Sequence, residues 1–98
     1  MNIVAVTSCP TGIAHTYMAA EQLEKKAKTL NHAIKVETQG SMGIENELSS
    51  DDIQKADYVV FAADIGVEQK ERFAGKKIIE VSVQEAIKHP DRIFEKMK

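Results

Sequence analysis

Apolar segments with two different patterns predict the strands of this protein. Segments 2–7 and 57–63 are apolar throughout their centres, which is typical of strands that are buried on both faces. Segment 33–39 alternates apolar with polar residues instead, and this pattern predicts a strand with one buried face and one exposed face. We therefore expect Glu37 and Gln39 to point outwards.

The remaining segments predict one more strand and several helices. Segment 77–82 is apolar apart from Glu80 and predicts a fourth strand. Apolar residues recur at spacings of three and four over 13–30, as they do on the buried face of a helix. Shorter helical segments are predicted at 49–56, within 65–73, at 83–89 and at 91–97.

The alternation of strand and helix, repeated four times, predicts an α/β fold with a parallel sheet. We expect a single domain over 1–98 with an open four-stranded sheet of order 2-1-3-4 and helices on both faces, a Rossmann-like three-layer sandwich. The fully apolar strands would be central and the other two would be edges. Ligands of open α/β sheets bind where the chain direction switches, beyond the carboxyl ends of the strands. Cys9, Ala63 and Asp64 belong to that edge.

Composition narrows the classes of protein to consider. The chain is 43% hydrophobic and 29% charged, as ordinary globular domains are, and its net charge of −2 argues against a nucleic-acid partner. The longest apolar run, 58–63, is far too short to span a bilayer, and we expect no secretory signal. One cysteine excludes an internal disulfide and a multi-thiolate metal site, and it suits the cytoplasm. We expect no cofactor and no metal.

The connection between the first strand and the long helix holds the candidate chemistry. Free backbone N–H groups and the dipole at a helix start form an anion site. Gly12 allows close approach of the backbone, and the hydroxyls of Ser8, Thr11 and Thr16 add donors. This field favours the thiolate form of Cys9, which we predict to be a nucleophile that carries a phosphoryl group. The predicted phosphate-binding loop comprises Pro10, Thr11, Gly12, Ile13, Ala14, His15 and Thr16.

Three other classes of protein fit the sequence less well. A low-molecular-weight cysteine phosphatase would have arginine six positions after Cys9, where this chain has His15, so hydrolysis is disfavoured. Asp64 is the one acid that the topology places near the site, and it is equally interpretable as a helix cap. A redox protein would need a second cysteine, and a dinucleotide site would need three spaced glycines. His15 either contacts the phosphate or points into solvent, and both interpretations stay open.

The string Cys-Pro-Thr-Gly-Ile-Ala-His-Thr at 9–16, followed by Met-Ala-Ala-Glu at 18–21, closely resembles a known family. That family is the fructose-type enzyme IIB of the bacterial phosphoenolpyruvate-dependent sugar phosphotransferase system (PTS). The resemblance continues at 36–41, 62–64 and 72–73, and so it covers nearly the whole chain.

The resemblance implies a relay of phosphoryl groups through Cys9. A phosphohistidine on enzyme IIA would donate the group, and phosphocysteine would pass it to a sugar, fructose or a related one, held by the membrane permease, enzyme IIC. The implied activity is that of a protein-phosphohistidine–sugar phosphotransferase, and the implied unit is an EIIB type-2 domain over 1–98. The domain would lie in the cytoplasm and would associate with the inner face of the membrane through enzyme IIC. The fold of the family is a small parallel four-stranded α/β sandwich.

Residues around this loop allow more than one interpretation. Gln39, Gly40 and Ser41 end the second strand on the same edge as Cys9, where they either line the site, contact a partner or simply form a turn. Arg72 and Phe73 are interpreted as packing rather than docking residues, and Tyr17 and Met18 as core residues. Candidates for lining the site or contacting a partner are Ser8, Gln39, Gly40, Ser41 and Asp64.

Overall fold

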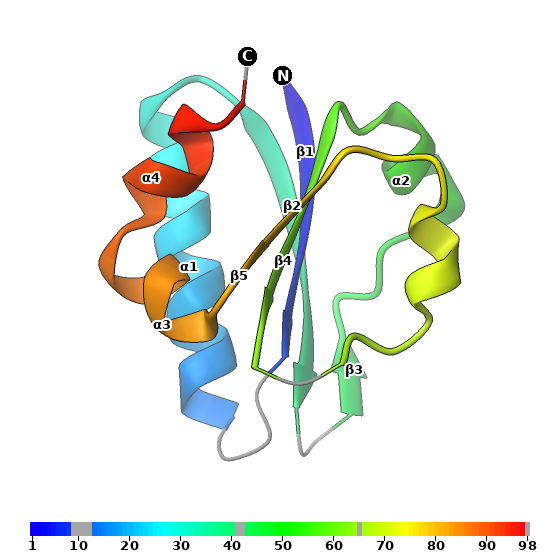
Figure 1. Ribbon diagram of the computed structural model, residues 1–98, viewed down its shortest axis with the longest axis horizontal. Coiled ribbons are helices and arrows are strands. Elements are labelled where there is room, and N and C mark those ends of the chain that lie inside the picture. Colours follow the sequence, from blue (N-terminus) through cyan, green and yellow to red (C-terminus); the bar gives the residue numbers. More distant parts are fainter. Residues whose placement is uncertain (9–12, 41–42, 65, 98) are drawn as a thin grey trace.

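Helices cover both faces of one twisted sheet (Figure 1). The computed structural model describes residues 1–8, 13–40, 43–64 and 66–97. The strands are β1 (Asn2–Ser8), β2 (Ala33–Gly40), β3 (Gly43–Glu45), β4 (Tyr58–Ala63) and β5 (Ile78–Val81). The helices are α1 (Ile13–Thr29), α2 (Ser50–Lys55), α3 (Val83–Lys88) and α4 (Pro90–Glu95), with a 3-10 turn, η1 (Lys70–Phe73).

The parallel part of the sheet has the predicted order. Strand β1 pairs in parallel with β2 on one side and β4 on the other, and β5 pairs in parallel with β4. The predicted order 2-1-3-4 is therefore confirmed as β2-β1-β4-β5, and the two fully apolar strands are central.

The predicted count of four strands and the edge position of the second strand are wrong. Within the described residues the sheet has five strands, because β3 adds in antiparallel fashion to β2 and forms the edge. Only three residues long, β3 is too short to give an alternating pattern, and it starts at Gly43 with a φ of 91°. A segment of that kind has the sequence of a turn, so it was expected to be a loop.

Alternate residues of the central strands fill two separate cores. Ile3 and Ala5 of β1 belong to the cluster formed with α1, α3 and α4, whereas Val4 and Val6 belong to the cluster formed with α2 and η1. Figure 1 shows the same division, with α1, α3 and α4 on one side of the sheet and α2 on the other. Burial on both faces explains why β1 and β4 are apolar at successive positions.

Side-chain caps mark the helix starts that the sequence predicts. Ser49 and Asp52 form a capping box at α2, in which the Asp52 N–H donates to Ser49 Oγ at 3.1 Å and the Ser49 N–H donates to Asp52 Oδ2 at 2.9 Å. Ser82 Oγ likewise accepts from the Glu85 N–H at the start of α3. Of the helices that the structure describes, none is long and apolar enough to cross a membrane.

Candidate functional site

Three strands end at one edge of the sheet, and α1 starts there. Ser8, the last residue of β1, is in register with Gln39 of β2 and Ala63 of β4. The chain leaves β1 at Ser8 and enters α1 at Ile13 on one face, while α2, which precedes β4, lies on the other face (Figure 1). This edge is the switch point that the topology predicts, so the described residues that flank the candidate loop lie where expected.

The central part of the candidate loop is not covered by the described residues. The predictions for Cys9, Pro10, Thr11, Gly12 and Ser41 fall outside those ranges and stay predictions. Their neighbours on both sides are described, so the site is built here from Ser8, from the first turn of α1 and from the ends of β2 and β4.

Ser8 and Asp64 meet through the backbone at this edge. The Ser8 side chain is buried, and its carbonyl oxygen accepts from the Asp64 N–H at 3.0 Å. Asp64 Oδ1 accepts from the Val83 N–H, in the first turn of α3, at 3.2 Å. Through these two bonds Asp64 connects the ends of β1 and β4 to α3, whose N-cap residue is Ser82. The proposed role of Asp64 in lining the site or contacting a partner stays a prediction.

The first turn of α1 has one buried and one exposed side. Thr16 is buried and its carbonyl oxygen accepts from Thr7 Oγ1 at 3.2 Å, which fixes α1 on β1. An added Cβ on Gly40 would lie 3.8 Å from Thr16 Oγ1, so the carboxyl end of β2 lies next to this turn. Ala14 and His15 are exposed, and the two interpretations of His15 stay open.

Tyr17 and Met18 were predicted to be core residues, and this prediction is wrong. Their exposed fractions are 42% and 49%. The Tyr17 hydroxyl donates to the Glu45 carboxylate of β3, and this bond raises the pKa of Tyr17. The edge strand β3 thus gives the start of α1 a polar neighbour that the sequence pattern did not reveal.

Glu37 is the most unexpected residue of the site. It was predicted to face outwards, yet its side chain is fully buried. Arg72 of η1 donates to it through both terminal nitrogens, at 3.0 Å to Oε1 and 2.9 Å to Oε2, and the Leu48 N–H donates to Oε1 at 2.9 Å. The outward prediction fails because the chain segments around Leu48 and η1 cover this face of β2.

Hydrogen bonds keep the buried pair ionised. Burial would by itself raise the pKa of Glu37, but the hydrogen bonds from Arg72, Leu48 and Gln39 outweigh it and hold that pKa below its usual range. The hydrogen bonds that Arg72 donates to Glu37 also raise the pKa of Arg72, whose side chain is 18% exposed. A charged, bidentate ion pair therefore lies beneath the carboxyl end of β2.

Gln39, also predicted to point outwards, is 4% exposed. Its Nε2 donates to Glu37 Oε2 at 2.7 Å and to the Glu68 carbonyl oxygen at 3.2 Å. Its Oε1 accepts from the Glu68 N–H at 2.8 Å. The Gln39 amide is thus committed to partners within the fold, which argues against a direct contact with a ligand. Phe73 is buried and Arg72 is paired, so these two residues have the packing role that was expected.

Thr38 is a further buried polar residue, on the face of β2 that the alternation predicts to be buried. It is in register with Thr7, and its Oγ1 has no hydrogen-bond partner among the described residues. Thr7 has one, so the two neighbouring hydroxyls on the α1 face differ in this respect. A buried threonine within an alternating strand gives no signal by which sequence alone could identify its hydroxyl as unpaired.

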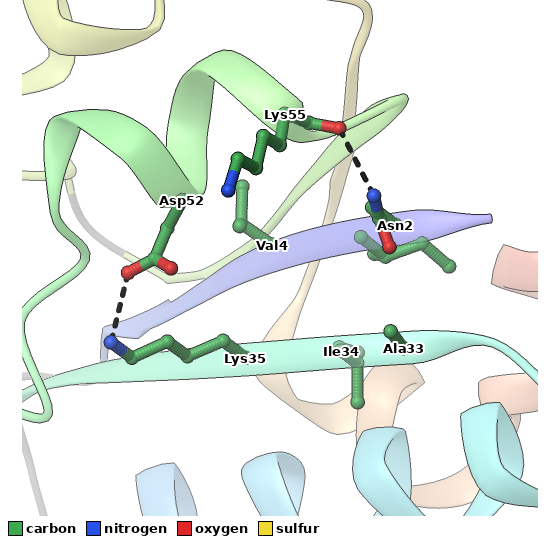
Figure 2. A pocket seen from close by; sticks show the side chains of 8 residues that line it. Asn2, Val4, Ala33, Ile34, Lys35, Asp52 and Lys55 are labelled. Atoms are coloured by element: carbon green, nitrogen blue, oxygen red, sulfur yellow. Dashed lines mark hydrogen bonds and ion pairs between the residues drawn. The ribbon is translucent and has the colours of Figure 1, made fainter.

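Cavities lie both near this edge and far from it. One of about 360 Å³ adjoins Ala63 at the carboxyl ends of β4 and β5. Figure 2 shows another, of about 210 Å³, at the amino ends of β1 and β2, where Lys35 Nζ lies 2.8 Å from Asp52 Oδ2. The residues that the structure describes contain no group of three His, Cys, Asp or Glu side chains that could hold a metal ion.

Comparisons with known proteins identify relatives along nearly the whole chain. Residues 4–96 match the family model described as "PTS system, Lactose/Cellobiose specific IIB subunit". The chain is 53% identical over 96 residues to the "PTS system fructose-like EIIB component 2" of Escherichia coli K12, which covers 98% of this chain and 91% of that protein. It is 54% identical over 99 residues to the "Fructose-like PTS system EIIBC component" of the same strain.

The match to the EIIBC component covers 99% of this chain but only 20% of that protein. This chain therefore spans about one fifth of that relative. A solved domain of the fructose-specific IIABC component of the PTS from Borrelia burgdorferi has the same fold. Its TM-score is 0.91 at 46% identity, and the match covers 96% of this chain and 89% of that domain.

Proposed function

This chain belongs to the IIB subunits of the PTS, and on that basis we propose that Cys9 carries the phosphoryl group between an enzyme IIA and a sugar. As a fructose-type IIB component, the chain is a phosphotransferase subunit that takes part in phosphoryl transfer to sugar. The relatives are transferase components, so a phosphatase function is not favoured.

The proposed relay has two transfers. In the first, the Cys9 thiolate attacks the phosphorus of a phosphohistidine on enzyme IIA, so an S–P bond forms, the N–P bond breaks and the imidazole leaves with the electron pair. In the second, a sugar hydroxyl attacks the phosphocysteine, so an O–P bond forms, the S–P bond breaks and the hydroxyl proton is released. Both transfers depend mainly on in-line positioning and on donors around the phosphoryl oxygens.

One observation carries the assignment to Cys9. This residue directly follows Ser8, where the central strand β1 ends, and only positions 9–12 separate that strand end from Ile13, the start of α1. A nucleophile in so short a connection is close in sequence to the first N–H groups of a 17-residue helix, which favour an anion. We propose that residues 10–16 form the phosphate-binding loop, with Thr16 anchored on β1 through Thr7.

The proposed partners are enzyme IIA as donor and the membrane permease, enzyme IIC, which holds the sugar. The relative named as an EIIBC component supports the pairing with IIC, and the IIABC component supports the pairing with IIA. We propose fructose or a related sugar, because the names of these relatives include fructose, although the family model is described by lactose and cellobiose. The chain would act as a single domain over 1–98, in the cytoplasm at the inner face of the membrane.

Labelling with radioactive phosphoenolpyruvate, the general PTS carrier proteins and an enzyme IIA tests this function. Wild-type protein should take up one phosphoryl group, and Cys9→Ser should take up none from the same donor. Lys35→Met, at the opposite end of β2, is the control and should be labelled like wild type. Label on Cys9→Ser equal to that on wild type would refute the relay. Sustained turnover of a generic aryl phosphate would instead favour a phosphatase.

A further inference from the structure

Buried polar side chains join the carboxyl end of β2 to the loop that follows β4. The Gln39 amide forms hydrogen bonds with both the N–H and the carbonyl oxygen of Glu68. It also donates to the carboxylate of Glu37, which forms an ion pair with Arg72. We refer to Glu37, Gln39, Arg72 and the Glu68 backbone as the clamp. Its hydrogen bonds between β2 and the segment after β4 connect residues that are 29 or 35 positions apart in the sequence.

The clamp takes the place of an apolar core at one end of the sheet only. The rest of the sheet face that α2 and η1 cover is filled by apolar residues such as Val4, Val6 and Phe61. A buried ion pair commonly adds no more stability than apolar residues of similar volume would. The polar substitution is confined to the edge where β1 ends, and departures from local rules are expected where a protein has a function to serve.

Hydrogen-bond geometry fixes the Gln39 amide in one orientation. Its oxygen accepts from the Glu68 N–H, and its nitrogen donates both to the Glu68 carbonyl oxygen and to the Glu37 carboxylate. A flipped amide would place donor against donor and acceptor against acceptor at these contacts. The carboxylate of Glu37 therefore orients Gln39, and Arg72 keeps that carboxylate charged.

The loop that follows β4 is bonded to the ends of two strands that flank the candidate site. The loop leaves β4 beside Ser8, whose carbonyl oxygen accepts from the Asp64 N–H, and it is held again at Glu68. The next residue, Gln69, has a φ of 57°, which is unfavourable for a residue with a side chain, and its carbonyl oxygen accepts from Arg72 Nε at 3.0 Å. Surrounding contacts thus hold the segment in a conformation that it would not readily adopt alone.

We propose that Gln39 is a positioning residue for phosphoryl transfer. By bonding to Glu68, it keeps the segment 66–69 against the carboxyl end of β2, where Gln39 is in register with Ser8 of β1, and so it sets the geometry in which Cys9 accepts the phosphoryl group. This role rests on the proposed relay through Cys9. Gln39 itself contacts neither donor nor acceptor, because its amide is used within the clamp. Its effect should therefore fall on the transfer step and not on the binding of enzyme IIA.

Rapid-quench phosphorylation of the full chain at several concentrations of phosphorylated enzyme IIA tests this role. In Gln39→Leu the saturating rate of Cys9 labelling should fall about tenfold, because small displacements of supporting groups slow transfer strongly. The half-saturating concentration of enzyme IIA should stay within about twofold of wild type. Circular dichroism first verifies that the variant folds. If it does not fold, Gln39→Asn, whose shorter amide cannot span the same partners, replaces it with the same expectation.

Lys35→Met is the matched control for these measurements. Lys35 is also a polar residue of β2 that bonds to another element, α2 (Figure 2). It lies near the amino end of the strand, in register with Val4, whereas Gln39 is in register with Ser8. It should keep both the wild-type rate and the wild-type half-saturation. A folded Gln39→Leu with the wild-type saturating rate, or with a change only in half-saturation, would overturn the positioning role alone. Wild-type protein that takes up no label on Cys9 would overturn the relay itself.

Discussion

Individual polar residues in this fold differ mainly in whether the sheet supplies them with a partner. Thr7 and Thr38 are neighbours in register on the α1 face, and both are buried. The hydroxyl of Thr7 donates to the Thr16 carbonyl oxygen, while that of Thr38 has no partner among the described residues. A buried hydroxyl without a hydrogen bond lowers stability, since it has lost its bonds to water.

This difference predicts opposite effects of one substitution at the two positions. Thr38→Val should raise the free energy of unfolding by about 1 kcal/mol, because it removes an unsatisfied buried group. Thr7→Val should lower it by about 1 kcal/mol, because it removes a buried hydrogen bond between β1 and α1. Urea unfolding at neutral pH measures both. Equal destabilisation by the two substitutions would mean that the Thr38 hydroxyl is satisfied.

At the level of elements, α2 is held by its capping box and by an ion pair to β2. The Lys35 ammonium, 2.8 Å from the Asp52 carboxylate, and the hydrogen bonds from Ser49 hold the pKa of Asp52 at about 2. The capping part of this arrangement was predictable, because Ser49 and Asp52 are close in sequence. The pairing with Lys35 was not, because it depends on how α2 lies across β2 (Figure 2).

Because the pKa of Asp52 is lowered in the folded protein, acidification should reduce stability. The folded form favours the charged Asp52, so its stabilisation is present above roughly pH 4 and is lost as the pH falls towards the folded-state value. Asp52→Asn should be less stable than wild type at pH 7 and should lose less stability between about pH 4 and pH 2. Asp51→Asn, in the same turn of α2, is the control and should decline as wild type does. Urea midpoints across this pH range check the expectation, and identical slopes for Asp52→Asn and wild type would contradict it.

For the whole molecule, the Glu37–Arg72 pair is the main polar link between the sheet and the segment that follows β4. The two partners are not equally buried, since the Glu37 side chain is fully buried and the Arg72 side chain is 18% exposed. Removal of Arg72 would leave a carboxylate in the interior, whereas a guanidinium without Glu37 can still reach water. The consequences of losing each partner should therefore be unequal.

A double-mutant cycle tests this asymmetry. Arg72→Leu should lower the free energy of unfolding by about 3 kcal/mol at pH 7, and Glu37→Leu by less. Without Arg72 the pKa of Glu37 should rise, so the stability lost in Arg72→Leu should partly return as the pH falls below that raised value. The double variant should recover much of the loss, because no unpaired charge remains. Equal and additive losses would show that the pair is not coupled in this way.

Elements formed by residues that are close in sequence could be predicted without the structure, whereas contacts between distant residues could not. The strands 2–7 and 57–63, the long helix and the helical segment 49–56 were predicted because burial on both faces, helical periodicity and capping residues leave local patterns. The three-residue β3 was missed, since it leaves no such pattern. The candidate loop was chosen by its residue types and its resemblance to a family, and its residues 9–12 lie outside the described residues.

The sequence by itself determined the parallel order β2-β1-β4-β5, the edge at which Cys9 follows β1, and membership of the IIB family. Only the tertiary structure decided which face of β2 is covered. Alternation in 33–39 records which residues are polar, but not whether another segment supplies them with partners. Leu48 and Arg72, distant in sequence, bring hydrogen bonds and a compensating charge to Glu37. For that reason a strand with an apparently exposed face became the buried support of the candidate site.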